Sequence, residues 1–454
     1  MSIWLSGCAI VGQEYRRPES VLPPAHWEAA LPHGGSRLAL NAWWQKLQDP
    51  TLSGLLEATL TRHPGLEGAQ AAIESARAAL RMQEAGDQPT ARTSGQLQQA
   101  GHPTANPNAA TMTSRAVAVD AGWELDLFGR VQRATEGALA KVAARSAEWH
   151  SLKITLAAET ASLYNELRTC ERLTAALNQE AASRQTSHEV TRVATRAGLT
   201  APAESAVMQA RVAEVLSRLA GQQAECALTI KGLVALTGLA EPEMRTRLHA
   251  RTGQPLNAPM LTVTTLPMQL LAQRPDLAAY EQELVAANAE IGVAEAARFP
   301  RMSLLGNIGI GVISSSGRGS QEVQSWSFGP ALSWPVLDGG IIEAGVTAAR
   351  ARHAMALASY RAKVREAVRE VESVLVNLEA SQRRLEEARN LVQGMTLFRQ
   401  AAEENWRTGG INRLTLEEAR RQQLEAERSK IQLEGRQMQY WINLYKALGG
   451  GWGS

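Results

Sequence analysis

The spacing of hydrophobic and polar residues changes between a period of two and a helical period along the chain, and this change predicts its elements. Residues 90–100 and 115–127 alternate between two kinds of side chain, and a loop full of turn-forming residues joins them. The apolar face of the second segment comprises Val117, Val119, Ala121, Trp123 and Leu125. Alternation of this kind is typical of a strand with one exposed face. The pattern therefore predicts a β-hairpin over residues 90–127.

A second β-hairpin is predicted over residues 301–334. Its two alternating segments cover residues 302–313 and 323–334, with a Ser/Gly turn between them. One face of these segments carries Leu304, Gly306, Ile308, Ile310, Val312, Trp326, Phe328, Leu332 and Trp334. The other face carries mainly small or polar side chains. These two faces fit a soluble sheet packed on a core, and they also fit a membrane barrel that is apolar toward lipid and polar toward its lumen.

Very long helical patterns follow both hairpins. From Gly129 to about Arg196, helix-forming residues dominate and proline is absent. About 65 residues at roughly 1.5 Å each span on the order of 100 Å, whereas a globular helix averages about 11–12 residues. Gly198 and Pro202 interrupt this pattern, which then resumes. A similar pattern without proline runs from Val336 to the end of the chain.

The order of helix, hairpin and long helix occurs twice with a constant offset. Pro89 and Pro300 are 211 positions apart, and the same offset relates other pairs. These pairs are Gly95 with Gly306, Trp123 with Trp334, Gly129 with Gly340, Arg196 with Arg407, and Gly198 with Gly409. One offset without an insertion over this length indicates a duplicated half-protein, because solenoid repeats are only about 20–50 residues long.

The duplication defines the domain organisation that we expect. Repeat 1 covers residues 70–238 and repeat 2 covers residues 281–449, with a linker at residues 239–280 that contains several prolines. The other parts are the remnant of a lipoprotein signal at residues 1–8, an extended segment and first helix at 9–69, and a tail at 450–454.

Two hairpins beside such long helices make a poor globular core, and alone they leave open strand edges. Pooling hairpins from several chains into one closed barrel removes both problems, and closure is required in lipid. We therefore favour a membrane barrel over a soluble sheet.

Composition narrows the class of protein further. The 454 residues carry a formal net charge of +2, without the basic stripe that is typical of nucleic-acid binders. Only 5% of residues are aromatic, and long tracts are rich in Ala, Leu, Gln, Glu and Arg, as in long helices and coiled coils. No run of 18 apolar residues is present, so the sequence predicts no transmembrane helix.

The sequence gives little indication of an enzyme. Its eight histidines are scattered, without an HExxH motif or a Cys-His cluster at metal-ligand spacing. The glycine-rich segment from Gly306 to Gly311 lies inside a predicted strand and opens no helix, which argues against a phosphate-binding loop. We expect no catalytic residues, no metal and no cofactor other than a covalent lipid.

Cys8 is the candidate for that lipid. The tetrapeptide Leu5-Ser6-Gly7-Cys8 resembles a bacterial lipobox, and Ala9 rather than Asp at the next position would imply sorting to the outer membrane. Only seven residues precede Cys8 and none is positively charged, so most of a signal peptide is missing. Either the start codon is placed too late or the segment was trimmed. The alternative interpretation is a chance tetrapeptide.

Cys170 and Cys226 lie 28 residues either side of Gly198. In an oxidising periplasm they would be level and able to pair if the chain reverses at Gly198. A reversal nearer Pro202 would offset them by several residues, beyond the reach of a disulfide. We expect buried free thiols.

Several motifs point to a family. Those around repeat 2 are Leu270-Leu271-Ala272-Gln273-Arg274-Pro275-Asp276-Leu277, Ala286-Ala287-Asn288-Ala289-Glu290-Ile291-Gly292, Arg298-Phe299-Pro300, Gly329-Pro330-Ala331-Leu332-Ser333-Trp334-Pro335 and Leu337-Asp338-Gly339-Gly340. Earlier in the chain are Trp43-Trp44, Asp49-Pro50 and Trp123-Glu124-Leu125-Asp126-Leu127-Phe128-Gly129. Together they resemble the TolC-like outer-membrane efflux factors, the NodT/OprM-type lipoproteins, from Cys8 to about Leu448.

The resemblance implies a mainly α fold with a small β part, assembled as a homotrimer in the outer membrane. Each chain would give four strands to a 12-stranded barrel, and the long helices would form a periplasmic α-helical barrel. This tunnel would dock a periplasmic adaptor protein and an inner-membrane pump of the RND type, so the protein would be a passive exit duct. Outer-membrane lipid would contact Trp123, Ile308, Ile310, Trp326, Phe328 and Trp334.

Two turns would lie at the end of the helix pairs away from the membrane, where a duct must close and a partner must dock. Their residues are Arg196, Gly198 and Leu199 in repeat 1 and Arg407, Gly409 and Gly410 in repeat 2. In related proteins a leucine and an acidic residue just after the second turn narrow the aperture. The matching positions here are Leu414 and Glu418, although the family usually has Asp at the latter.

Three copies of Glu418 around an axis would form an acidic ring that favours cations. The alternative is a solvated helix face, because Glu417, Arg420 and Arg421 are charged as well. Two rival hypotheses concern the whole protein. A soluble periplasmic coiled-coil scaffold predicts sustained heptads without hairpins, and an adaptor-type export component would need one helical hairpin with β-rich domains.

Overall fold

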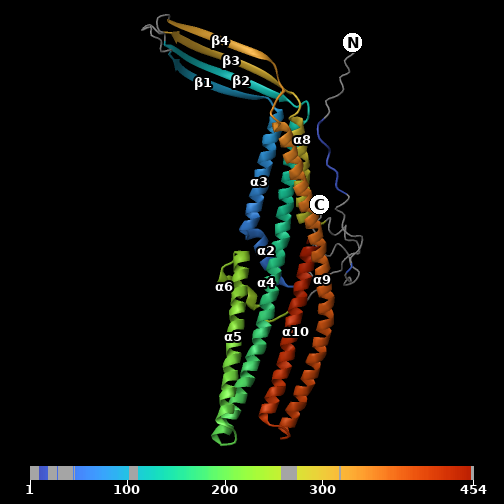
Figure 1. The fold of residues 1–454 in the computed structure, drawn as a ribbon. Helices are drawn as coiled ribbons and strands as arrows, with labels where there is room; N and C mark the ends of the chain where they lie inside the picture. The colour runs from blue at the N-terminus through green and yellow to red at the C-terminus, as the bar shows by residue number, and fades with distance from the viewer. Residues whose placement is uncertain are drawn as a thin grey trace. The chain divides into compact units, whose positions relative to one another are not determined.

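The computed structural model describes residues 10–18, 28, 44, 47–101, 111–256, 273–315 and 319–450. These residues are mainly helical and include one small sheet (Figure 1). Cys8, Trp43 and the motif residues 270–272 lie outside the described residues. In the part of the chain that is described, no helix is both long enough and apolar enough to cross a membrane.

The two repeats have the same elements in the same order. Repeat 1 contains α3 (Pro64–Glu84), β1 (Thr90–Ala100), β2 (Met112–Leu125), α4 (Arg130–Arg196) and α5 (Pro202–Thr237). Repeat 2 contains α8 (Pro275–Ala296), β3 (Arg301–Ser315), β4 (Gly319–Ser333), α9 (Ile341–Arg407) and α10 (Arg413–Ala447). The first residues of α3, β1, α4 and α5 are each 211 positions from their counterparts. The predicted duplication is therefore confirmed, and α4 and α9 each contain 67 residues.

Among the described residues, three further elements lie outside this pattern: α2 (Pro50–Arg62), the 3-10 turn η3 (Ala85–Asp87) and α6 (Glu241–His249). The last is a helix within the stretch that we expected to be a linker. Its sequence carries helix signals, because Pro242 lies in its first turn, acidic residues begin it and Arg247 and His249 end it.

The chain forms two compact units, and α4 and α9 each contribute to both. Unit 1 comprises Met1–Ser20, Ala71–Ser146 and Ala278–Ala362. Unit 2 comprises Val21–Gln70, Ala147–Leu277 and Lys363–Ser454.

The four strands of unit 1 form one antiparallel sheet in the order β1-β2-β3-β4. Because β2 pairs with β3, the two hairpins lie side by side (Figure 1). One row of directly opposed residues is Thr93, Val119, Ile308 and Trp326. The next row, on the other face, is Arg92, Asp120, Asn307 and Ser327. Among the described residues, the outer edges of β1 and β4 have no strand partner.

The two faces of the sheet differ in chemistry. Ile308 is 63% exposed, Trp326 81% and Phe328 73% on one face. On the other, Asn307 Nδ2 donates a hydrogen bond of 2.6 Å to Asp120 Oδ1. Soluble monomers rarely expose large contiguous apolar patches, so the apolar face is not the surface of a soluble domain.

Two tryptophans tie the hairpins to the helices that precede them. Trp123 Nε1 donates to the carbonyl oxygen of Asp87 at 3.0 Å, and Trp334 Nε1 donates to that of Arg298 at 3.1 Å. Donors and acceptors are both related by the offset of 211, so the duplication extends to single hydrogen bonds.

Unit 2 has its own apolar core. Leu52 and Leu55 of α2, Leu233 of α5 and Met244 of α6 are fully buried. Leu66, Leu156 and Leu236 form a further buried cluster. The core therefore draws on α2, α3, α4, α5 and α6.

Cys170 and Cys226 form a disulfide with their Cα atoms 5.7 Å apart, so the expectation of buried free thiols is wrong. The chain reverses at Gly198, whose φ is 73°. Residues equally distant from Gly198 are therefore level on α4 and α5. Pro202 does not mark the reversal but is the first residue of α5.

Candidate functional site

The turn between α4 and α5 is a defined capping motif. Leu199 N–H donates to the carbonyl of Ala194 at 2.9 Å, and Gly198 N–H donates to that of Thr195 at 3.0 Å. These paired bonds form a Schellman motif, whose central residue has a positive φ and is usually glycine. Leu199 is 78% exposed, so the turn presents an apolar side chain at its tip.

The turn between α9 and α10 repeats this motif. Gly410 N–H donates to the carbonyl of Asn405 at 2.7 Å, and Gly409 N–H donates to that of Trp406 at 3.0 Å. Asn412 then caps α10. All the predicted tip residues are exposed, namely Arg196, Gly198, Leu199, Arg407, Gly409 and Gly410. Both turns are in unit 2, and both have the accessibility that docking requires.

Leu414 and Glu418 lie in the first two turns of α10, four residues apart and so on one helix face. Leu414 is half-buried and Glu418 is exposed. Arg421 Nη2 donates to Glu418 Oε2 at 2.7 Å, and this bond lowers the pKa of Glu418. Glu418 therefore remains ionised through the neutral and mildly acidic range.

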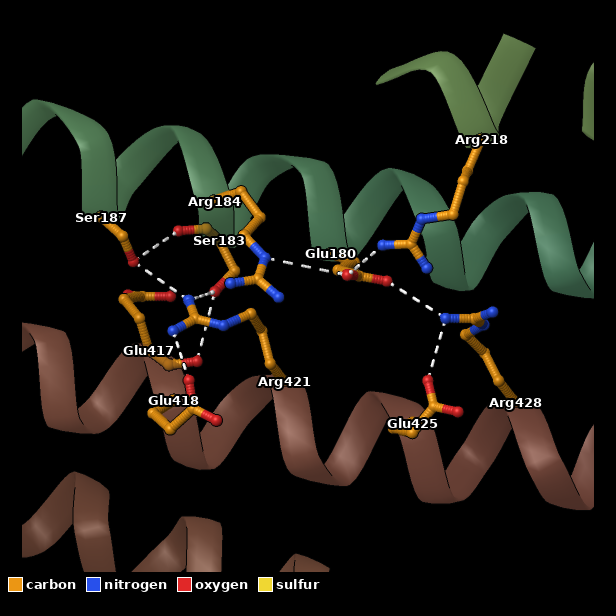
Figure 2. A network of polar contacts seen from close by, with 10 residues as sticks. All are labelled: Glu180, Ser183, Arg184, Ser187, Arg218, Glu417, Glu418, Arg421, Glu425 and Arg428. Atoms are coloured by element: carbon orange, nitrogen blue, oxygen red, sulfur yellow. Dashed lines mark hydrogen bonds and ion pairs between the residues drawn. The ribbon is translucent and has the colours of Figure 1, made fainter. Parts of the chain in front are cut away.

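A buried carboxylate that we did not predict lies farther along α4. Only 9% of the Glu180 side chain is exposed, and three guanidinium groups surround it (Figure 2). Arg218 Nη2 of α5 is 2.7 Å away, Arg428 Nη1 of α10 is 3.2 Å away and Arg184 Nε of α4 is 3.8 Å away. One carboxylate thus connects three helices.

Arg421 forms a second connection between α4 and α10. Its Nη1 donates to Ser183 Oγ at 3.1 Å and to Ser187 Oγ at 3.0 Å (Figure 2). Ser183 Oγ in turn donates to the carbonyl of Glu417 at 3.3 Å. Both serines are buried, so polar groups hold α10 against α4 at this level.

The sequence contains a pattern that indicates this contact on α4, but none on α10. Ser183, Ser187 and Thr191 recur every four residues, which places their hydroxyls on one face of a helix. Their partner Arg421 lies more than 200 residues later, and no local period identifies it. Tertiary register is needed to find Glu180 and Arg421.

The chemistry of this cluster is that of fixed ion pairs. Its carboxylates are bound to guanidinium groups, which do not give up their protons in proteins. Among the described residues, no group of three or more His, Cys, Asp or Glu could hold a metal ion. The arrangement is suited to holding α4, α5 and α10 together.

The residues predicted to face lipid share one side of the sheet in unit 1. Ile308 is opposite Trp326, and Trp123 is opposite Leu304 on the same face. Ile310 and Phe328 belong to this face by alternation along β3 and β4, and Trp334 directly follows β4. Their contact with lipid remains a prediction.

Residues 55–239 and 266–450 each match the family described as outer membrane efflux protein. The two matches cover most of the chain, and they are again 211 positions apart. The chain therefore belongs to the outer membrane efflux protein family. It is an outer-membrane channel component of an efflux system, which spans the outer membrane and the periplasm.

Individual relatives are similar over nearly their whole length. Nodulation protein T of Rhizobium leguminosarum bv. viciae is 29% identical over 85% of this chain and 80% of its own. The probable efflux pump outer membrane protein TtgC of Pseudomonas putida is 28% identical over 99% of this chain and 93% of its own. The solved outer-membrane channel OprN has a TM-score of 0.82 at 29% identity, over 97% of this chain and 99% of that one.

The Neisseria gonorrhoeae MtrE channel in its open state shares the fold, with a TM-score of 0.81 at 22% identity over 98% of both chains. The predicted fold class, a mainly α chain with a duplicated helix–hairpin–long-helix unit, is thus confirmed. The scaffold and adaptor hypotheses are not supported, because the chain has two β-hairpins and matches a channel family in both repeats.

Proposed function

We propose that three copies of this chain form the exit duct of a tripartite efflux pump. Each copy contributes its four-stranded sheet to a shared 12-stranded barrel and its long helices to a periplasmic α-helical barrel. The observation that carries this proposal is a sheet with an exposed apolar face and two open edges in the same chain as two 67-residue helices. The duct is passive, and an inner-membrane transporter of the RND type supplies the energy.

The adaptor protein docks at the two turns. Arg196, Gly198 and Leu199 form one docking tip, and Arg407, Gly409 and Gly410 form the other. Both tips rest on rigid Schellman motifs and expose charged or apolar side chains. These features suit a protein partner better than a lipid surface.

Leu414 and Glu418 form the gate. Their position directly after the second turn, on one face of α10, supports this role. Three copies of Leu414 narrow the aperture, and three ionised copies of Glu418 favour the passage of cations.

Cys8 carries a lipid at the base of the sheet. Val11 N–H donates to the carbonyl of Phe128 at 3.1 Å, and Arg133 donates to the carbonyls of Val11 and Gly12 at 3.2 and 3.0 Å. Phe128 lies three residues after the end of β2, so the chain at residue 11 is held close to the end of that strand. Only three residues separate Cys8 from Val11, and three residues span at most about 10 Å, which supports a lipid anchor close to the sheet. A Cys8→Ser variant that still incorporates labelled palmitate would contradict this assignment.

Conductance in planar bilayers tests the gate. We expect Leu414→Ala to raise single-channel conductance and Glu418→Gln to lower the preference for cations over anions. Glu404→Gln is a matched control, because Glu404 is an exposed acid near the same turn but on α9. Unchanged conductance and selectivity in both gate variants would remove the gate assignment.

Export by cells tests the duct itself. A deletion strain should become sensitive to exported compounds and recover with the wild-type chain. Toluene and antibiotics belong in the panel, because relatives are named as a toluene efflux pump protein and an antibiotic efflux pump protein. Recovery of the protein in the soluble fraction without detergent would contradict the proposal.

A further inference from the structure

The apolar face of the sheet carries very little charge. The pairing of the strands assigns to this face the odd-numbered residues of β1 and β2 and the even-numbered residues of β3 and β4. Within the described strands, only Arg115 of β2 and Glu322 of β4 are charged on it. An arginine that faces lipid is costly in the middle of a membrane but costs little near its surfaces, so the depth of Arg115 decides its role.

The duplication of the chain indicates this depth. Trp123 and Trp334 mark the base of the sheet, because their indole N–H groups bond the backbone just before each hairpin. Arg115 lies eight residues before Trp123, and Trp326 lies eight residues before Trp334. Arg115 and Trp326 are thus related by the offset of 211. Since the two repeats occupy equivalent places around a closed barrel, Arg115 lies at the depth of Trp326.

This depth is the outer margin of the apolar band. Eight residues of strand cover about 26 Å, and the tilt of barrel strands reduces this length to roughly 20 Å across the membrane, close to the ~25 Å of a typical band. Aromatic residues flank such bands at both surfaces, here Trp123 and Trp334 at the helix end and Trp326 at the other. In the proposed duct the helices lie in the periplasm, so Arg115 lies at the outer surface.

Arg115 has no counter-charge of its own. Its side chain is exposed and forms no ion pair or hydrogen bond with any residue that the structure describes. The residues directly opposite it on the same face, Leu97 and Val312, are apolar. Glu322 lies in the same row but two strands away, about 10 Å. It is also twelve residues before Trp334 rather than eight, and therefore lies farther out.

Hydrogen-bonding side chains follow directly beyond Arg115 on the same face. The next row of paired residues is Gln99, Thr113, Ser314 and Ser320. The hydroxyls of Ser314 and Ser320 are 2.7 Å apart. Guanidinium groups bind phosphate through paired hydrogen bonds, and hydroxyl and amide groups can bond the hydroxyls of a sugar. Along this face the surface thus changes from apolar to cationic to hydroxyl-rich.

We infer that Arg115 binds the phosphate of a glycolipid in the outer leaflet of the membrane. The acyl chains of such a lipid lie against the apolar band, its phosphate meets Arg115, and its sugar meets the row that contains Thr113 and Ser314. A phospholipid without a sugar would leave that row unused. This inference rests on the proposed barrel, because it needs the apolar face to be in lipid. Three copies of the chain offer three equivalent sites.

Native mass spectrometry of the intact assembly with added diphosphoryl lipid A tests this site, because it counts the bound glycolipids. We expect up to three on the wild type. Arg115→Gln should weaken binding about tenfold, since it removes charge-assisted hydrogen bonds to the phosphate. Arg115→Lys keeps the cation and should retain most of the binding. The melting temperature should be unchanged in both variants, because Arg115 has no partner among the described residues.

Arg92→Gln is the matched control. Arg92 is also an exposed arginine of the sheet, but it lies on the polar face, directly opposite Asp120. We expect this variant to bind lipid A as the wild type does. An equal loss in Arg92→Gln and Arg115→Gln would overturn the site, because binding would then follow net charge. Equal binding of dephosphorylated lipid A would overturn the phosphate contact, and equal competition by phosphatidylglycerol would overturn the assignment to a glycolipid.

Insertion of the same preparations into planar bilayers distinguishes this inference from the proposed function. If the wild type forms conducting trimers that bind no lipid A, the glycolipid site is wrong and the duct stands. If the wild type forms no membrane-inserted assembly, the duct fails and the glycolipid site fails with it.

Discussion

At the scale of single residues, the carboxylate of Asp49 binds three groups from separate segments of unit 2. Its Oδ1 accepts from Leu52 N–H at 3.0 Å and so caps α2, and its Oδ2 accepts from the Tyr164 hydroxyl at 2.9 Å. Arg251 Nε lies 3.3 Å from the same Oδ2. Burial raises the pKa of Tyr164 to about 12, so this hydroxyl stays a neutral donor. Asp49 itself is 3% exposed, and water cannot replace it.

We predict that Asp49→Ala lowers the free energy of unfolding by about 3–5 kcal/mol. The change removes a helix cap, worth about 1 kcal/mol, and leaves a phenol and a guanidinium without their buried partner. Urea denaturation of the purified protein, followed by circular dichroism, measures the loss. Ser53→Ala is the control, because Ser53 Oγ bonds the backbone carbonyl of Asp49 and not its side chain. Equal stability of the two variants would contradict this role.

Residues whose task is local could be predicted, and residues whose partners are distant could not. Asp49-Pro50 is a local signal for a helix start, and in the structure α2 begins at Pro50 with Asp49 as its cap. The turns at Gly198 and Gly409 could also be predicted from the sequence. A turn of this kind needs a residue with a positive φ, and glycine adopts one readily. Glu180 was missed because its role is defined by its ion pairs with Arg218 and Arg428. Arg428 belongs to the other repeat, so no local pattern links it to Glu180. The helix face that meets another helix is set by tertiary packing.

At the scale of elements, the disulfide joins the middle of α4 to α5 and has no counterpart in repeat 2. The positions equivalent to Cys170 and Cys226 at the offset of 211 are Ser381 and Gln437. Hairpin α9/α10 thus depends on non-covalent contacts alone at this level, whereas α4/α5 is cross-linked. The first hairpin is therefore the more constrained of the two.

We predict that the double variant Cys170→Ser, Cys226→Ser loses about 4 kcal/mol of stability in its α4/α5 hairpin. Closing a loop of this length lowers the entropy of the unfolded chain by roughly that amount. Thermal melts of the wild type and variant measure the loss, and limited proteolysis near Gly198 locates it. Ser381→Ala is the matched control in the other hairpin. Two reactive thiols at these positions in the denatured, unreduced wild type would show that no bridge forms.

The type of each long element was predictable, but some boundaries were not. The predicted second strand of repeat 2 began at residue 323, whereas β4 begins at Gly319. The missed residues are polar, and they pair as a continuation of the sheet beyond its apolar band. The helix α6 was missed because prolines dominated the interpretation of its stretch, although its end charges were those of a helix. For the cysteines, a reversal at Gly198 and one nearer Pro202 were both left open, and free thiols were expected; the reversal at Gly198 makes the cysteines level and lets them pair.

At the scale of the whole molecule, the sheet of one chain is incomplete. Every position of β1 is exposed, and β1 and β4 each offer an unpaired outer edge in the described part of the chain. In lipid, unpaired backbone groups are too costly to remain at a sheet edge. The sequence predicted the hairpins and the need for closure, but the number of copies came from the family resemblance. The β2–β3 pairing within one chain had no local signal, because the hairpins lie about 200 residues apart.

Closure requires that β1 of one copy pairs with β4 of the next, and engineered cysteines test this. We predict that Ser94→Cys combined with a cysteine scanned along the polar face of β4, at Ser325, Ser327 or Ser333, gives cross-linked trimers at one register. The contact is heterologous, so it closes into a ring only at a fixed number of copies. Denaturing electrophoresis without reductant then shows a ladder that ends at three chains of 49.0 kDa.

The pair Ala118→Cys, Gly309→Cys controls for this experiment, because these residues face each other within one chain across β2 and β3. It should cross-link readily and still migrate as a single chain. If no β4 position gives a product larger than one chain while this control cross-links, β1 and β4 do not meet between copies. A ladder that ends at two or four chains would keep the edge pairing but exclude the trimer. The largest cross-linked product gives the number of chains in the ring. This number is therefore measured on the protein itself and does not depend on the family resemblance.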